Sequence, residues 1–151
     1  MSNKFVADVH LGKLARLLRL LGFDTLYKND YTSKEFLQIG SKEDRIVLSR
    51  NSSLVRNKEL KCLIIASEDP LLQLKQVVHQ FGLKNQIHPF TRCIICNGIL
   101  KPVAKESVHH QLQKNTVLYF NEFWQCQNCK RIYWKGSHYE RMKKTIESIA
   151  S

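Results

Sequence analysis

The chain has five cysteines, and four of them form two identical Cys-x-x-Cys clips, Cys93 with Cys96 and Cys126 with Cys129. This spacing lets two thiolates reach one tetrahedral Zn²⁺ through metal–sulfur bonds of about 2.3 Å. Two clips complete a four-sulfur shell with no open position, so they predict one structural zinc ion per chain rather than a catalytic one. Two redox dithiols or two disulfides are the alternative interpretation.

The segment between the clips, residues 97–125, is longer than in the compact zinc pattern but can hold the hairpin and connecting loop of a ribbon. Asn97 and Gly98 follow the first clip as a turn pair that suits a tight knuckle. The fifth cysteine, Cys62, lies in an apolar run and is predicted to be a buried small hydrophobe rather than a ligand.

The length of 151 residues fits one medium domain, or a domain of about 90 residues followed by a small metal-stapled one. The cysteine positions favour the second arrangement. We therefore expect an α/β domain over residues 1–90 and a zinc ribbon with a C-terminal helix over residues 91–151.

The formal net charge is +11, and both halves of the chain share the excess of basic residues. Nucleic acid is the natural partner for this charge, although an acidic membrane surface would respond to the same field. Because the first residues lead straight into an apolar strand, we expect no secretory signal, and no apolar segment nears the roughly 18–20 residues that span a bilayer. These features predict a cytoplasmic protein without a membrane partner, in a reducing compartment where paired cysteines hold metal.

Short apolar strands alternate with amphipathic helices in the first part of the chain. The expected strands are residues 5–7, 24–27, 45–49 and 62–65, and the expected helices are residues 12–21, 32–40 and 69–81. The second helix opens on the capping box Thr32-Ser33-Lys34-Glu35, and the third has Asp69 as N-cap and Pro70 as first residue. Continuous apolar strands between helices predict a parallel sheet covered on both faces.

The last third of the chain differs in character. Residues 117–120 are expected to form a strand between the two clips, and residues 132–134 form a second aromatic run after them. Residues 138–149 are predicted to be a basic terminal helix.

Acidic residues follow several of the predicted strands. Asp8 follows the first, Asp30 the second, and Glu68 and Asp69 the fourth, while Glu35 lies one turn into the second helix. Ligands of open parallel sheets bind beyond the carboxyl ends of the strands. We therefore expect these carboxylates to share a pocket that binds Mg²⁺ or Mn²⁺, which prefer oxygen ligands.

Most of these acids also have a purely structural interpretation. Asp69 is explained as a helix cap, Asp30 as a turn residue and Glu35 as part of its capping box. Asp8 has no capping motif to explain it, which favours a functional role. Basic residues on the first helix are by default solvated charge, but their position next to Asp8 favours phosphate contact. These residues are Lys13, Arg16 and Arg19.

Two groups of motifs resemble a known family. The run Phe5–Arg16 with Leu18–Asp24 behind it resembles the opening of the PIN-like RNase domain found at the C-terminus of the Mut-seven exonuclease. The C-terminal motifs resemble the zinc ribbon of that family and its trailing motif, and nearly the whole chain is covered. They are Phe90–Cys93, Cys96–Gly98, Phe123–Cys126, Cys129, Tyr133–His138 and Glu140–Met142.

The resemblance implies a PIN-type sheet whose acids hold a divalent metal for hydrolysis of RNA phosphodiester bonds, with the ribbon as an RNA- or partner-binding element. Asp8 matches the first acidic position and Asp30 the second, and Asp69 is a further candidate. After the third strand the family typically reads Thr-Arg-Asp, whereas this chain has Ser49-Arg50-Asn51. The amide of Asn51 still offers an oxygen but lacks the charge, which predicts weaker metal binding. Arg50 is a further predicted RNA-binding residue.

The aromatic residues of the ribbon and one histidine are further candidates. Trp124, Tyr133 and Trp134 are candidates for stacking on unpaired bases, an interaction worth about 1–3 kcal/mol each. Some of them must form the ribbon core, so at most one or two are expected to be available, and Trp134 is the predicted RNA-binding residue. His138 is either structural or part of the RNA-binding surface, because four sulfurs already complete the zinc shell.

Three functions remain in competition. The first is a metal-dependent ribonuclease with a structural zinc ribbon, acting on single-stranded or structured RNA. The second is a module of the same fold that binds RNA or a ribonucleoprotein but has lost the chemistry, as Asn51 suggests. The third is a zinc-stapled protein–protein adaptor.

Overall fold

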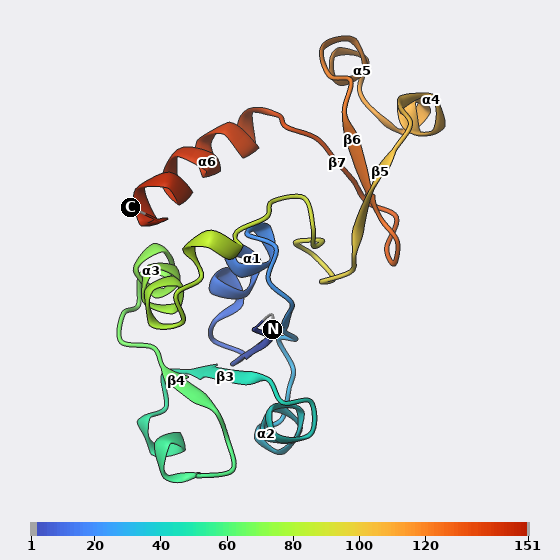
Figure 1. Cartoon of the computed structure of the whole chain (residues 1–151). Coiled ribbons are helices and arrows are strands. Elements are labelled where there is room, and N and C mark those ends of the chain that lie inside the picture. The colour runs from blue at the N-terminus through green and yellow to red at the C-terminus, as the bar shows by residue number, and fades with distance from the viewer. Residues whose placement is uncertain (1–2, 151) are drawn as a thin grey trace.

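A computed structural model describes residues 3–150 of the chain and shows an α/β unit followed by a cysteine-bearing ribbon and a terminal helix (Figure 1). The strands are β1 (Phe5–Ala7), β2 (Thr25–Leu26), β3 (Ile46–Ser49), β4 (Cys62–Ile64), β5 (Leu100–Val103), β6 (Phe123–Cys126) and β7 (Ile132–Tyr133). The α-helices are α1 (Gly12–Leu20), α2 (Ser33–Lys42), α3 (Pro70–Gln80), α4 (Lys105–Val108), α5 (Lys114–Tyr119) and α6 (Ser137–Ala150). Short 3₁₀ turns cover Ser52–Arg56, Lys84–Gln86 and His109–Gln111.

The first sheet has four strands in the order β2-β1-β3-β4, and every pair is parallel. The strands are continuous apolar runs because both faces of the central strands are buried. All residues of β1 and β3 are buried. The prediction of a parallel sheet flanked by helices is confirmed.

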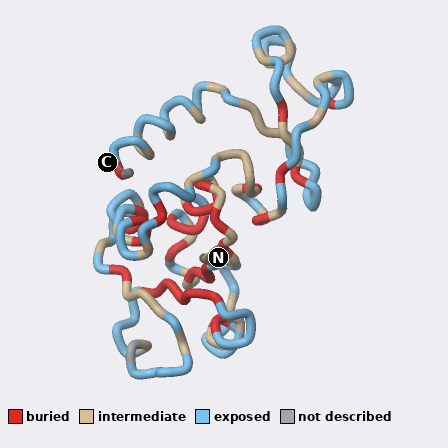
Figure 2. The backbone as a smooth tube through the Cα atoms, in the orientation of Figure 1, coloured by how far each residue is buried: buried red, intermediate tan, exposed pale blue. Residues whose placement is uncertain are grey.

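Helices cover the sheet on both faces (Figure 1). On one face α1 and α3 pack their apolar stripes against Phe5, Ala7 and Leu48 of the central strands. On the other face Phe36 of α2 packs against Val6 and Val47. The predicted capping box at Thr32 and Glu35 and the predicted cap at Asp69 are both present. Buried residues accordingly concentrate in the sheet and its covering helices (Figure 2).

The terminal helix returns from the ribbon to the first unit (Figure 1). Ile146 and Ile149 of α6 belong to the apolar cluster that α1 and α3 form on the sheet. The ring of His79 on α3 lies 3.2 Å from the main-chain oxygen of Ile149. The helix therefore bridges the two parts of the chain, and the division into residues 1–90 and 91–151 stays a prediction.

The ribbon is a three-stranded antiparallel sheet in the order β5-β6-β7. Pro102 interrupts the sequence pattern of β5, which the sequence analysis did not identify as a strand. β5 lies at the edge of this sheet and pairs through Pro102 opposite Trp124. An edge strand tolerates proline because it does not need every N–H for the ladder.

The prediction of a strand at residues 117–120 is wrong, because residues Lys114–Tyr119 form helix α5. The run Val117-Leu118-Tyr119 has strand-like composition, but a strand also needs a partner for its main-chain groups. Both edges of β6 are already paired, with β5 and β7. The segment therefore closes its hydrogen bonds locally, and Leu118 and Tyr119 stay exposed.

No helix within residues 3–150 is long and apolar enough to cross a membrane.

Candidate functional site

The four clip cysteines come together in one cluster in the ribbon. Their Sγ atoms all lie within 4.8 Å of one another. The Sγ atoms of Cys93 and Cys129 are 3.6 Å apart, and those of Cys96 and Cys126 are 3.4 Å apart. Four sulfurs at such separations fit a tetrahedral Zn²⁺ with bonds of about 2.3 Å. Cys62 lies outside the cluster, half-buried, with its Sγ 3.8 Å from the main-chain oxygen of Leu54.

The two clips have equivalent backbone geometry. The residue after each second cysteine, Asn97 or Lys130, has a positive φ of 69° or 68°. Each of these residues donates its N–H to the carbonyl of the first cysteine in its clip, at 2.9 Å and 3.0 Å. Asn and Gly tolerate this conformation well, which explains the turn pair after the first clip. Two matched knuckles of this kind point their sulfurs at one point.

Hydrogen-bond donors surround the cysteine sulfurs. Cys96 Sγ receives the N–H of Gly98 at 3.4 Å and the side-chain amide of Asn128 at 3.5 Å. Burial acts to raise the pKa of Cys96, but these bonds outweigh it and lower the pKa to about 6. Burial and the neighbouring sulfurs raise the pKa of Cys129 to about 12. The cluster therefore favours ionisation of the Cys96 thiol but opposes ionisation of the Cys129 thiol. A bound cation would stabilise the form in which all four thiols are ionised.

A buried arginine fastens the first clip to the sheet domain. The guanidinium of Arg19 on α1 donates to the carbonyl oxygens of Ile94 and Ile95 at 3.0 Å and 3.1 Å, and to Thr25 at 2.9 Å. Arg19 is only 4% exposed. The prediction that Arg19 contacts RNA is therefore corrected: its side chain is buried because it satisfies main-chain carbonyls of the clip.

Asp24, just ahead of β2, forms a second connection between the two parts. Its Oδ1 accepts hydrogen bonds from Arg45 at 2.8 Å and from the side-chain amide of Asn97 at 2.7 Å, while Arg92 lies 3.6 Å from Oδ2. Burial acts to raise the pKa of Asp24, but the bonds from Arg45 and Asn97 and the two positive charges lower it below its usual value. Nothing in the local sequence indicated this cluster, because its members are distant in the chain.

Asp8 occupies the carboxyl end of the central strand β1, as predicted. Its Oδ2 accepts a hydrogen bond from the hydroxyl of Ser49 at 2.9 Å, and its Oδ1 accepts one from the N–H of His10 at 3.2 Å. Ser49 is the last residue of the neighbouring strand β3, so two adjacent central strands fix this carboxylate. A carboxylate has about four lone-pair sites, so each oxygen can accept a further ligand.

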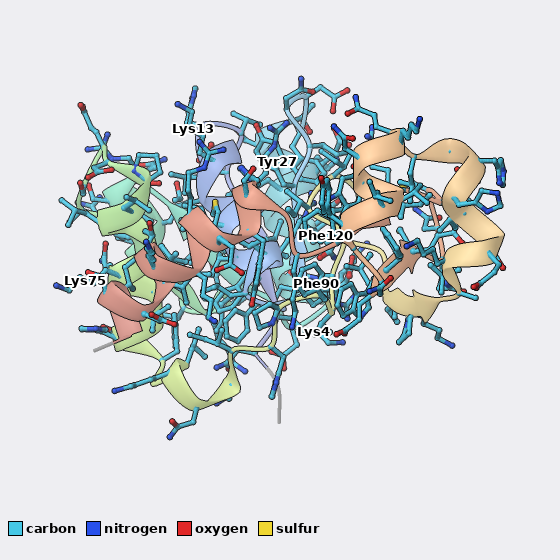
Figure 3. The ribbon with its side chains drawn as sticks, turned by 90° about the horizontal axis from the view of Figure 1, so that it is seen from above. Lys4, Lys13, Tyr27, Lys75, Phe90 and Phe120 are labelled. Carbon is cyan, nitrogen blue, oxygen red and sulfur yellow. The ribbon has the colours of Figure 1, made fainter. Side chains whose placement is uncertain are left out.

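Tyr27 supports the loop that carries Asp8. Its hydroxyl donates to the main-chain oxygen of Val9 at 2.8 Å, and its side chain lies beside Gly12 at the start of α1, where Figure 3 labels Lys13. A Cβ on Gly12 would lie 2.9 Å from the same hydroxyl oxygen. The glycine therefore leaves room for the tyrosine that holds the Asp8 loop, a pairing the sequence analysis missed.

The other polar residues predicted for this pocket make separate local contacts. Asn51 accepts hydrogen bonds from the N–H and hydroxyl of Ser53 through its Oδ1. Asp69 accepts the N–H of Leu71 at 3.2 Å as the cap of α3, and Asp30 is exposed in a turn. Glu68 lies 3.5 Å from Arg50 in an exposed ion pair. Glu35 completes its capping box.

The expectation of one shared carboxylate pocket is therefore not met. Within residues 3–150, the cysteine cluster is the only group of three or more His, Cys, Asp or Glu residues whose ligand atoms come together. Glu35 and Asp69 serve as helix caps, Glu68 is in an ion pair and Asp30 is exposed in a turn. This donor set does not form a closed cage, but it fits a hard cation that keeps several waters and binds through one carboxylate and substrate phosphates.

Three of the predicted RNA-binding residues line one hollow. Lys13 and Arg16 of α1 meet His138 of α6 there. None of the three has an ion pair or side-chain hydrogen bond to the described part of the chain, so the charges of Lys13 and Arg16 are available to a ligand.

Trp134 lies on the ribbon, half-buried, with its ring centroid 6.2 Å from that of Phe123. It lines a hollow of about 400 Å³ together with Ile94, Arg131 and Tyr133. By contrast, Trp124 stacks on Phe90 with ring centroids 4.1 Å apart and belongs to the ribbon core. The structure thus separates a core tryptophan from one with a face toward a basic hollow.

Comparison with known proteins gives one family. The family model described as Mut7-C RNAse domain matches residues 3–146. Comparisons with curated proteins and with solved structures found no match. The matched span includes the whole parallel sheet, both cysteine clips and most of α6. The chain therefore belongs to the Mut7-C RNAse domain family.

Proposed function

We propose that this protein hydrolyses RNA phosphodiester bonds in a reaction that depends on Mg²⁺ or Mn²⁺ and centres on Asp8. The single observation that carries the proposal is the placement of Asp8. Hydrogen bonds from Ser49 and from the His10 N–H fix this carboxylate at the carboxyl end of β1. Membership of an RNase family gives RNA as the substrate class.

Each residue at the edge has a defined task under this proposal. Asp8 holds the divalent cation on the lone pairs that its two hydrogen bonds leave free. Ser49 orients the carboxylate, and Tyr27 fixes the loop behind it. A bound cation would supply positive charge to the phosphate oxygens and make the attacking water more acidic. Asp30 and Asn51 would contribute through water rather than as direct ligands.

The cysteine ribbon would have a structural role with Zn²⁺. Its four sulfurs leave no position for a substrate. Its exposed face carries Arg131 and Trp134, which would bind RNA or a ribonucleoprotein by charge and stacking.

A cleavage assay tests the proposal. Zinc-loaded protein is mixed with end-labelled single-stranded RNA, with and without Mg²⁺ or Mn²⁺, and compared with Asp8→Asn. We expect metal-dependent cleavage that falls by about 100-fold or more in the variant. Asp44→Asn is the matched control, because Asp44 is an exposed acid that pairs with exposed Lys61. Equal rates with and without the metal, or in Asp8→Asn and the wild type, would show the mechanism to be wrong.

A second function, RNA binding without turnover, is favoured by one observation. The oxygen of Asn51, which stands where the family resemblance implies an acid, is engaged in capping the turn that begins at Ser52. Under this alternative the protein binds RNA in a salt-sensitive manner, and no divalent metal produces cleavage. The same assay, run with a binding measurement, separates the two functions.

A further inference from the structure

One hollow beside the sheet edge combines basic and apolar side chains from separate elements. Its volume is about 430 Å³. This lies within the range of small-molecule sites, about 300–1,000 Å³. The walls come from α1, the first residue of α3, the first cysteine clip and α6.

The pattern of α1 explains one wall. Lys13, Arg16, Leu17 and Leu20 occupy positions i, i+3, i+4 and i+7 of the helix, so they share a single face. Lys13 and Arg16 are exposed, whereas Leu17 and Leu20 are half-buried. One end of this face is therefore cationic and the other apolar.

Two other elements complete the hollow. His138 and Met142 lie one turn apart on α6, and Ile94 projects from the first clip. Arg19 holds the main chain of Ile94 in place through a 3.0 Å hydrogen bond. The apolar part thus consists of Leu17, Leu20, Ile94 and Met142, and the basic part of Lys13, Arg16 and His138. Among residues 3–150, no acidic side chain lines the hollow.

One end of the hollow lies at the sheet edge that carries the proposed reaction centre. Lys13 is in the first turn of α1, directly after the loop that carries Asp8, and Pro70 is the first residue of α3. These helices begin where β1 and β4 have ended, at the carboxyl edge of the sheet. A strand of RNA with a phosphate at Asp8 would therefore have a neighbouring nucleotide within reach of this hollow.

We infer that the hollow is a subsite for one nucleotide of a single-stranded RNA, and the inference rests on the proposed function. The phosphate lies against Lys13, Arg16 and His138. The base lies flat against the apolar side chains of Leu20, Ile94 and Met142. Because those contacts are apolar, the subsite accepts different bases, and it requires an unpaired base.

Equilibrium binding tests the cationic part. Zinc-loaded protein is titrated with a fluorescent uridine decamer in magnesium-free buffer, so that no turnover interferes. The pair Lys13→Gln/Arg16→Gln should weaken binding at least tenfold at low salt. It should also reduce the slope of log K against log salt by about 1.4, since each contact to a single strand contributes about 0.7.

The matched control removes the same charge elsewhere. Lys75 and Lys84 are exposed and have no ion pair among the described residues, and Lys75 lies well apart from Lys13 in Figure 3. Lys75→Gln/Lys84→Gln should weaken binding less than threefold. Equal losses of affinity in the two double variants would mean that RNA binding depends only on the overall charge, and the subsite would be rejected.

Met142 provides a direct probe of the apolar part, because the chain has only two methionines. In protein labelled with ¹³C at the methionine methyls, Met142→Leu assigns the signal. This signal should shift on RNA addition with the affinity found by fluorescence. Met142→Ala should weaken RNA binding several-fold but leave binding of an abasic oligonucleotide unchanged. An acidic peptide that moved the signal where RNA did not would overturn the assignment.

The result is separable from the fate of the proposed reaction. RNA binding at Met142 without any cleavage would reject the hydrolase proposal and keep the subsite. Cleavage of RNA with an unmoved Met142 signal would reject the subsite and keep the hydrolase.

Discussion

The side-chain amide of Asn97 donates a 2.7 Å hydrogen bond to the carboxylate of Asp24, and its carbonyl oxygen accepts the N–H of Thr25 at 3.0 Å. Asn97 belongs to the first cysteine knuckle, whereas Asp24 and Thr25 lead into β2. One side chain therefore positions the metal-binding ribbon against the parallel sheet. The position of the ribbon relative to Asp8 depends on this junction and on Arg19.

The junction should make stability depend on acid pH. The folded protein holds the pKa of Asp24 below the usual carboxyl value of 3.8 because of Arg45, Asn97 and Arg92. The stabilisation is therefore complete above that usual value and is lost as pH falls through the lowered pKa. The difference in unfolding free energy between wild type and Asp24→Asn should shrink as pH falls from 5 to about 2.5.

Urea unfolding across this pH range measures the effect. The control is Asp44→Asn, because Asp44 is exposed and Asn also tolerates its positive φ of 53°. A difference between wild type and Asp24→Asn that stays constant with pH would contradict the assigned role of the junction.

The cysteine cluster should hold one zinc ion per chain, measured by elemental analysis. Cys96→Ser should lose most of the metal and lower Tm by about 10 °C or more, because metal binding and folding of such a site are coupled. Cys62→Ser is the matched control, since Cys62 is outside the cluster. Unchanged zinc content in Cys96→Ser would show that the four sulfurs do not act as one site.

Asn51→Asp should raise metal-dependent cleavage. An aspartate keeps the oxygen that caps the turn at Ser52, so the local fold should survive, and it adds a charge near Asp8 that attracts a hard cation. The measurement is the initial cleavage rate as Mn²⁺ is titrated. A lower half-saturating Mn²⁺ concentration supports a weakened enzyme, whereas no cleavage at any Mn²⁺ concentration favours an RNA-binding module.

Gly22 should tolerate no side chain. Its φ is +98°, and a Cβ there would collide with the main-chain oxygen of His88. Gly22→Ala is expected to destabilise the protein by about 3 kcal/mol. Gly82→Ala is the control, with φ +59° and open space around the added carbon, so only about 1–2 kcal/mol of backbone strain is expected. Equal losses would show that close packing at Gly22 is unimportant.

Sequence patterns predicted the parts of the fold whose causes are local. The strands around Val6 and Val47 and the caps at Thr32 and Asp69 depend on neighbouring residues, and the structure confirms them. The pairing of the two cysteine clips was also predicted, because the Cys-x-x-Cys spacing is local, and the structure brings their four sulfurs together. Strand β5 was not predicted, because it contains Pro102, and proline is tolerated only where a strand lies at the edge of a sheet.

The remaining features depend on contacts between distant residues. Arginine side chains usually lie on the surface. Only the hydrogen bonds to the carbonyls of Ile94 and Ile95 explain why Arg19 is buried. Helix α5 has strand-like residues, and only the filled edges of β6 explain why it is not a strand. Asp8 was predicted from its position after a strand. Its hydrogen-bond partner Ser49 was not, because the two residues meet only through the pairing of β1 with β3.

The most direct test of the central claim is a crystal of the protein with a non-cleavable RNA, soaked in Mn²⁺ and measured for anomalous scattering. The account predicts a Mn²⁺ peak at bonding distance from an oxygen of Asp8 and in contact with an RNA phosphate. The zinc peak within the cysteine cluster serves as the internal standard. A map with the zinc peak and bound RNA but no Mn²⁺ at Asp8 would contradict the claim that this carboxylate centres a metal-dependent ribonuclease site.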